Sequence, residues 1–183
     1  MAHRIFVALP TSDAFKKEVE SWNENFKVKN PDVYDKIRWM PPENLHITLI
    51  PPFNKDDGGI KNTLEALTNV EGKTGHFNIF FEKVSYGPTF GHPRLIWISG
   101  RHEERVEALK RKIEGALKTP SDKRQFSPHV TIARFREYDF RTFSLKRLDE
   151  SFEFRETCLE FVLMESKTLP SGAVYQVLGR FKT

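Results

Sequence analysis

The stretch Leu45-His46-Ile47-Thr48-Leu49-Ile50 has the same pattern as Pro128-His129-Val130-Thr131-Ile132-Ala133, much later in the chain. In each stretch, a histidine and a threonine alternate with apolar residues. Because side chains alternate across a strand, each histidine shares one face with its threonine, and the apolar residues share the other face. We therefore expect two strands, each with one face in the core and a His-x-Thr pair on the opposite face.

The segments before the two motifs repeat as well. Residues 5–9 form a short apolar run, and residues 15–26 carry apolar side chains spaced by three or four. Residues 95–98 and 106–117 have the same two patterns, in the same order, before the second motif. These patterns predict a strand and an amphipathic helix. We expect one α+β domain over residues 1–183, with two pseudo-symmetric lobes whose antiparallel sheets line a central cleft and whose helices pack outside.

Composition indicates an ordinary globular protein. Hydrophobic residues make up 38% of the chain and charged residues 30%, as in many soluble domains. The single Cys158 lies in an alternating apolar run, so we interpret it as a core residue without a disulfide partner. The apolar run near the N-terminus is too short for a signal peptide or a membrane span, which predicts a cytoplasmic protein with no membrane contact. A net charge of +4 suits a polyanionic partner and also suits a simple solvated surface.

Paired histidines suggest acid–base chemistry on a phosphodiester. An unperturbed imidazole has a pKa of about 6.5, so near neutral pH one ring can take a proton from water while the other returns a proton to the leaving oxygen. The hydroxyls of Thr48 and Thr131 would hold the non-bridging oxygens. We therefore predict His46 and His129 as the catalytic residues. Histidine with threonine is a poor zinc ligand set, so we expect neither a metal nor another cofactor.

A fixed cation would stabilise the negative charge that develops on the phosphate. Arg134 follows the second motif, at an odd offset from His129. In a regular strand, that offset points the guanidinium to the apolar face. If Arg134 serves the site, a bend, a bulge or the end of the strand must turn it round.

With these flanking residues the chain resembles the 2H phosphoesterase superfamily, named for its two His-x-Thr/Ser motifs. Within it, the chain is similar to the RNA 2′,3′-cyclic phosphodiesterases, also called 2′-5′ RNA ligases. The segments RWMPPENLHITL (38–49) and FSPHVTIAR (126–134) carry the likeness, supported by residues 4–10, 86–97 and 170–175. The resemblance implies a bilobal fold with both histidines in a cleft, and hydrolysis of a 2′,3′-cyclic phosphate to a 2′-phosphate.

The resemblance also implies individual roles. His46 would be the acid at the 3′-oxygen leaving group and His129 the base for water, although the near-symmetry of the motifs allows the reverse. Arg124 stands where such proteins often carry a basic residue, and it is otherwise a solvated cation beside Lys123. The phosphate contacts that the resemblance implies come from Thr48, Thr131 and Arg134.

The chain departs from the family after the first motif. Many members continue with a Phe-Leu-Gly type of segment, whereas Ile50-Pro51-Pro52-Phe53 follows here. The loop beside the cleft therefore differs, and substrate preference can differ with it. Phe53 would either stack on a base or anchor the loop.

Three functions remain open on the sequence alone. The first is hydrolysis of RNA 2′,3′-cyclic phosphate ends by a monomer. The second is reversible 2′-5′ joining of RNA ends, such as tRNA halves, or cleavage of 2′-5′ oligonucleotides, by the same acid–base pair. The third is binding of nucleotides or RNA ends without chemistry, which the mild positive charge and the many aromatic residues would support.

Overall fold

The computed structural model describes residues 2–89, 91–120, 125–169 and 172–183. In this part of the chain the strands are β1 (His3–Pro10), β2 (Arg38–Trp39), β3 (His46–Lys55), β4 (Phe77–Gly87), β5 (Leu95–Gly100), β6 (His129–Arg134), β7 (Asp149–Cys158), β8 (Glu160–Leu169) and β9 (Gly172–Lys182). The helices are α1 (Asp13–Lys29), α2 (Pro31–Tyr34), α3 (Asp57–Thr68), α4 (Glu104–Leu117) and α5 (Glu137–Phe140), with a 3₁₀ turn η1 (Pro42–Asn44).

The strands form one antiparallel sheet in the order β7-β4-β5-β6-β3-β1-β8-β9, with β2 also paired to β6. The halves β7-β4-β5-β6 and β3-β1-β8-β9 meet where Ile47 of β3 lies opposite Val130 of β6. Both side chains are fully buried. These core residues pack together and so bring the two backbones within pairing distance. The α+β class is as predicted, but the two expected sheets are joined into one by this pair.

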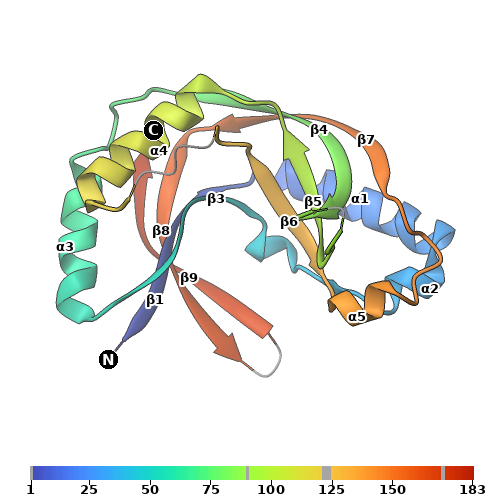
Figure 1. The fold of residues 1–183 in the computed structure, drawn as a ribbon. Helices are drawn as coiled ribbons and strands as arrows, with labels where there is room; N and C mark the ends of the chain where they lie inside the picture. The colour runs from blue at the N-terminus through green and yellow to red at the C-terminus, as the bar shows by residue number, and fades with distance from the viewer. Residues whose placement is uncertain (1, 90, 121–124, 170–171) are drawn as a thin grey trace.

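In each repeat unit, the helix packs on the half of the sheet that does not contain the strand before it (Figure 1). α1 follows β1, yet its Phe15 ring packs against Phe81 of β4 and Phe152 of β7, with ring centroids 4.9 and 5.8 Å apart. α4 follows β5, yet it contacts β3, and α3 packs beside it. Figure 1 shows α3 and α4 at one end of the molecule and α1 and α2 at the other. The two halves are therefore interlocked by their own helices.

The boundaries of α1 follow from its sequence. The hydroxyl of Ser12 accepts a hydrogen bond from the backbone N–H of Phe15 at 3.1 Å, an N-cap that stabilises a helix by about 1 kcal/mol. The buried side chains Phe15, Val19 and Phe26 form one apolar stripe. Asn30 and the following proline end the helix, because proline cannot continue the hydrogen-bond pattern. The helix predicted for this segment is confirmed.

Cys158 is a core residue, as its sequence context indicated. Its side chain is buried at the end of β7. Burial, and secondarily the nearby Glu156 carboxyl, raises the pKa of the thiol to about 12. The thiol therefore stays protonated and unreactive near neutral pH.

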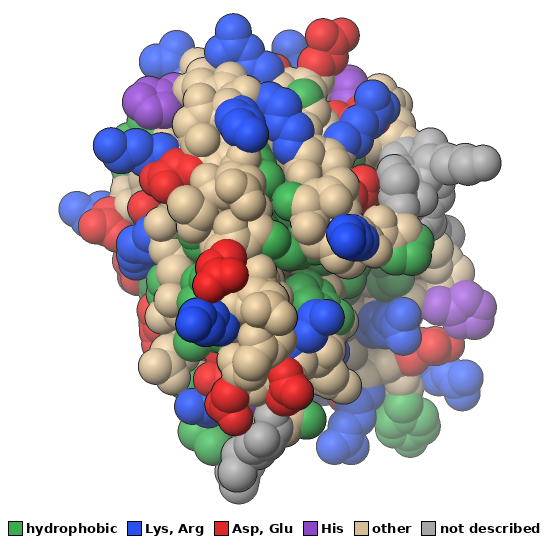
Figure 2. Space-filling model, turned by 90° about the vertical axis from the view of Figure 1, so that its left-hand side faces the viewer, with side chains coloured by type: hydrophobic (Ala, Val, Ile, Leu, Met, Phe, Trp, Pro, Cys, Tyr) green, Lys and Arg blue, Asp and Glu red, His purple; other side chains and the backbone are tan. Residues whose placement is uncertain are grey.

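Charges are mixed on the face that carries α3 and α4, where Lys and Arg side chains lie next to Asp and Glu side chains (Figure 2). On α4, Lys110 pairs with Glu114 and Arg111 pairs with Glu107. The basic residues of this helix are therefore partly neutralised locally. No helix of the described residues is long and apolar enough to cross a membrane.

Candidate active site

β3 and β6 bring the two motifs to one small cavity of about 30 Å³. The motif residues reach it from the face opposite Ile47 and Val130, which lie in the core. A space of this size accepts a small group and not a whole nucleoside. The residues that line the cavity are Met40, His46, Thr48, His129, Thr131, Arg134 and Tyr175.

The two imidazoles are held in the same way. The Nδ1–H of His46 donates to the carbonyl oxygen of Asn44 at 2.7 Å, and the Nδ1–H of His129 donates to that of Ser127 at 2.9 Å. Because a carbonyl oxygen only accepts, Nδ1 carries a proton in both rings. Nε2 is therefore the nitrogen that can gain or lose a proton. In His46 this atom lies 3.1 Å from the hydroxyl of Thr48.

The aromatic surroundings of the two rings differ. His46 packs against both Phe6 and Tyr175, with ring centroids at 5.0 and 5.3 Å, and these two aromatic rings also contact each other. His129 lies against Trp97, with the ring centroids 4.8 Å apart. Packed aromatic rings exclude water, so the pseudo-symmetry of the motifs does not extend to the solvation of their histidines.

This packing changes the protonation of His46. Burial lowers the pKa of His46, and the positive charge of Arg134 and the neighbouring His129 lower it further. The hydrogen bond to the carbonyl of Asn44 opposes these effects. Both low polarity and a like charge disfavour the imidazolium form. Nε2 of His46 is therefore unprotonated at neutral pH unless an anion balances this charge.

A bulge in β6 turns Arg134 toward the cavity. In the pairing of β5 with β6, adjacent residues of β5 face Thr131 and Ala133, which makes Ile132 an extra residue. Ile132 and Ala133 are both buried, so the alternation shifts by one position after the bulge. Arg134 consequently shares the cavity with His129. The sequence required an irregularity here, and the structure contains one.

Other predicted residues have different positions. Phe53 is partly buried against the main core and does not line the cavity. The loop expected at Pro51-Pro52-Phe53 is wrong, because β3 continues through these residues and Phe53 pairs with Ile5 of β1. Arg124 lies outside the described residues. Met40 and Tyr175 line the cavity although the sequence did not single them out. Tyr175 belongs to a segment that carried the family resemblance, but no local spacing connected it with either motif.

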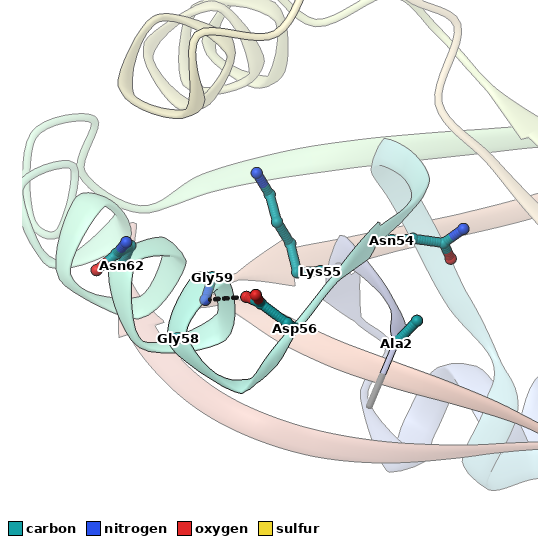
Figure 3. Close-up of a pocket in the computed structure, with 7 residues that line it drawn as sticks. All are labelled: Ala2, Asn54, Lys55, Asp56, Gly58, Gly59 and Asn62. Carbon is teal, nitrogen blue, oxygen red and sulfur yellow. Dashed lines mark hydrogen bonds between the residues drawn. The ribbon is translucent and has the colours of Figure 1, made fainter.

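A larger hollow, of about 590 Å³, lies at the start of α3 (Figure 3). The carboxylate of Asp56 accepts a hydrogen bond from the backbone N–H of Gly59 at 2.7 Å and caps the helix. No histidine lines this hollow among the described residues, and its carboxylate already serves the helix end. The paired-motif cavity is therefore the candidate active site despite its smaller size. The residues of the larger hollow are Ala2, Asn54, Lys55, Asp56, Gly58, Gly59 and Asn62.

The side chains of the candidate site suit an anion. Its described lining offers two imidazoles, two motif hydroxyls and the guanidinium of Arg134, with neither a carboxylate nor a thiolate. Structural and catalytic zinc sites are built from three or four histidine, cysteine or carboxylate ligands. Across the described residues, no group of three or more such side chains is placed to hold a metal ion.

Known proteins resemble this chain in sequence and in fold. The RNA 2′,3′-cyclic phosphodiesterase of Archaeoglobus fulgidus is 28% identical over 182 residues, which cover 98% of this chain and 99% of that protein. A crystal structure from Thermus thermophilus matches with a TM-score of 0.75 and 22% identity, covering 98% of this chain and 97% of that one. E. coli LigT complexed with 3′-AMP matches with a TM-score of 0.75 and 17% identity, covering 100% of this chain and 98% of that one.

The family follows from a match that includes both motifs. Residues 11–168 match the model of the 2′-5′ RNA ligase superfamily. This range contains β3 and β6, and therefore both histidines of the candidate site. The chain belongs to the 2′-5′ RNA ligase superfamily.

Proposed function

We propose that this protein hydrolyses 2′,3′-cyclic phosphates at RNA 3′ ends to 2′-phosphomonoesters, with His46 and His129 as a general acid–base pair and without a metal ion. The observation that carries the proposal is the single cavity lined by both imidazoles and both motif threonines. Relatives named RNA 2′,3′-cyclic phosphodiesterase support the substrate class. The complex of LigT with 3′-AMP supports a nucleotide ligand for this fold.

The reaction needs one proton to be removed and another to be supplied. Water attacks phosphorus and gives a proton to Nε2 of one histidine, while the bond from phosphorus to the 3′-oxygen breaks. The second histidine gives its Nε2 proton to that oxygen, which leaves as the 3′-hydroxyl. The two rings have then exchanged protonation states, and solvent resets them. Each such proton transfer typically contributes about 10²- to 10⁴-fold to the rate.

The phosphate oxygens need donors and a counter-charge. Thr48 and Thr131 each offer a hydroxyl to a non-bridging oxygen in this proposal. Arg134 neutralises the charge that develops as water adds, an electrostatic effect that is strong in a site with little water. Its approach to the cavity through the β6 bulge supports this role.

The resemblance implies His46 as the acid and His129 as the base, and the packing around His46 is compatible with that order. A bound phosphate anion favours the imidazolium form of a nearby histidine. Because burial lowers the pKa of His46, its imidazolium is a better proton donor than an exposed one. On the basis of the family resemblance, we assign proton donation to His46.

The activity is tested with an RNA oligonucleotide that ends in a 2′,3′-cyclic phosphate, in the presence of a chelator. We expect a gain of one water by mass spectrometry and a 2′-phosphate by chromatography. Tight binding of the RNA end with no product after long incubation would instead support a binding module.

The assignment of acid and base is tested with a 3′-thio analogue of the cyclic phosphate, whose sulfur leaves without a proton. His46→Ala should regain much of its lost rate on this analogue, and His129→Ala should not. The opposite pattern of rescue would reverse the two roles.

The superfamily match favours a second activity of the same site. In that activity, a 5′-hydroxyl of another RNA end takes the place of water, and the same bond to the 3′-oxygen breaks, which leaves a 2′-5′ linkage; the reverse of this step cleaves a 2′-5′ linkage. Incubation with paired tRNA halves, one ending in a cyclic phosphate, would yield a joined product resistant to 3′-5′-specific nucleases. Absence of that product under conditions that support hydrolysis would limit the protein to hydrolysis.

A further inference from the structure

A second hollow, of about 250 Å³, adjoins the catalytic cavity. β2 and η1 form one wall, and residues 172–175 at the start of β9 form another. Met40, Arg134 and Tyr175 line both spaces. The hollow is therefore the neighbouring space that a group extending from the cavity past these side chains would enter.

An RNA end cannot fit into the cavity as a whole. With about 30 Å³ available, the cavity accepts the reacting phosphate, while the nucleoside and the next phosphate must lie outside it. The adjoining hollow approaches the size of common small-ligand pockets, about 300–1,000 Å³. It is accordingly where the remainder of the terminal nucleotide can lie.

Two arginines stand side by side on the wall of this hollow. Arg38 of β2 is directly opposite Arg134 of β6 in the strand register, and both line the hollow. Directly opposite side chains have Cβ atoms about 5 Å apart, and like charges at such positions repel. A single-stranded RNA offers one negative charge per nucleotide along its backbone. Adjacent guanidiniums therefore suit two consecutive phosphates, with the reacting one at Arg134.

The start of β9 lies against the guanidinium of Arg38. Gly172 has a φ of +135°, and a Cβ atom there would overlap the guanidinium of Arg38. The side-chain amide of Asn44 donates to the carbonyl oxygen of Ala173 at 2.9 Å and holds the start of β9 against η1. Glu43 is the carboxylate among the described residues of the lining, and we assign it no phosphate contact.

We propose that Arg38 binds the phosphodiester immediately 5′ to the reacting nucleotide, so that the protein selects RNA chains over nucleoside 2′,3′-cyclic phosphates. This inference rests on the proposed function, since it needs the cyclic phosphate in the catalytic cavity. Guanidinium–phosphate hydrogen bonds are charge-assisted and are among the stronger ones in proteins. Loss of the negative charge on that linkage should therefore lower catalytic efficiency measurably.

The test compares three substrates that share a terminal adenosine 2′,3′-cyclic phosphate. They are the mononucleotide, the dinucleotide with a normal linkage, and the dinucleotide with an uncharged methylphosphonate linkage. For the unmodified protein, we expect kcat/KM to be about tenfold or more higher for the charged dinucleotide than for either other substrate. Arg38→Gln should reduce that ratio to within about twofold, and Arg38→Lys should give an intermediate ratio.

A matched control is Arg180→Gln. Arg180 is an exposed cation on β9, paired with Glu160, and lines neither space. The Arg180→Gln variant should keep the full ratio of kcat/KM between the charged and the uncharged dinucleotide. The salt dependence of kcat/KM for the charged dinucleotide should also become shallower in Arg38→Gln, by about 0.7 in the log–log slope.

The outcomes separate this inference from the proposed function. Turnover of all three substrates at equal efficiency by the unmodified protein would overturn the role of Arg38 and leave the activity intact. An equal fall on all three substrates in Arg38→Gln would overturn it too, because it would indicate a structural role through the hairpin. No turnover of any substrate would reject the proposed function itself. If Arg38→Gln does not fold, the role of Arg38 is decided by Arg38→Lys together with the methylphosphonate comparison on the unmodified protein.

Discussion

Ile47 and Val130, the central residues of the two His-x-Thr motifs, face each other where the halves of the sheet meet. On the opposite face of the two strands, His46, Thr48, His129 and Thr131 all line one cavity. One small anion in this cavity would therefore meet side chains of both motifs.

This arrangement makes both histidines necessary. We expect His46→Ala and His129→Ala each to lower kcat/KM on an RNA 2′,3′-cyclic phosphate end by about 10²- to 10⁴-fold, since each removes one proton transfer. Steady-state kinetics in the presence of a chelator measure the effect. His76→Ala, at an exposed position, is the control and should retain full activity. Near-normal activity in both motif variants would reject the acid–base account.

Arg134 should be detectable through the titration of His46. Burial lowers the pKa of His46, and the positive charge of Arg134 contributes to the same shift. Arg134→Gln removes a like charge and should therefore raise the His46 titration midpoint, while burial keeps it below about 6.5. Histidine ring signals followed by NMR across pH give the midpoints. The control is Arg155→Gln, at an exposed position on β7, which should leave the His46 midpoint unchanged. An unchanged midpoint in Arg134→Gln would show that the Arg134 charge does not act on His46.

Gly172→Ala should disturb the hairpin tip. The substitution sets a side chain at a φ of +135°, where its Cβ would overlap the guanidinium of Arg38. Such backbone strain typically amounts to about 1–3 kcal/mol, so we expect a lower melting temperature and a raised KM. Gly91→Ala is the matched control, because a Cβ there meets nothing within 4 Å. Equal melting temperatures of the two variants would show that the backbone around residue 172 adapts without strain.

His3 should stabilise the protein in a limited pH range. Its Nδ1 lies 2.6 Å from Glu165 and its Nε2 lies 3.1 Å from Asp57. The hydrogen bond with Glu165 is the main cause that raises the pKa of His3. The folded state therefore binds the proton more tightly, and this stabilisation is present below about pH 6.5 and lost as pH rises through the folded-state value.

The measurement is the difference in melting temperature between the unmodified protein and His3→Gln. We expect a larger difference at pH 5.5 than at pH 8.5. Glu165 remains ionised at the lower pH, because its hydrogen bond with His3 lowers the pKa of the carboxyl. The same difference at both pH values would assign the effect to packing alone.

Local patterns predicted the local elements well. Ser12 and Asn30-Pro31 mark the ends of α1, and the alternation around Ile47 and Val130 predicted the two motif strands. Such signals depend on neighbouring residues, which the sequence displays directly. For Arg134 to serve the site, the sequence required a bend, a bulge or the strand end, but no residue type marks the bulge that the structure has at Ile132.

Long-range partners could not be predicted in this way. The apolar stripe of α1 shows that Phe15 is buried, but the same stripe would fit either half of the sheet. The joining of the two halves depends on how closely β3 approaches β6, which periodicity does not record. Tyr175 reaches the cavity from a hairpin far along the chain. These features arise from tertiary packing.

The exchange of helices between the halves has a consequence for catalysis. Since α1 is tethered to β1 but packs on β4 and β7, and α4 is tethered to β5 but contacts β3, neither half retains a complete core if the chain is divided. A hinge motion that separates the two halves would expose the side chain of Phe15. The packing of α1 and α4 across the halves therefore opposes a change in the spacing of the two imidazoles.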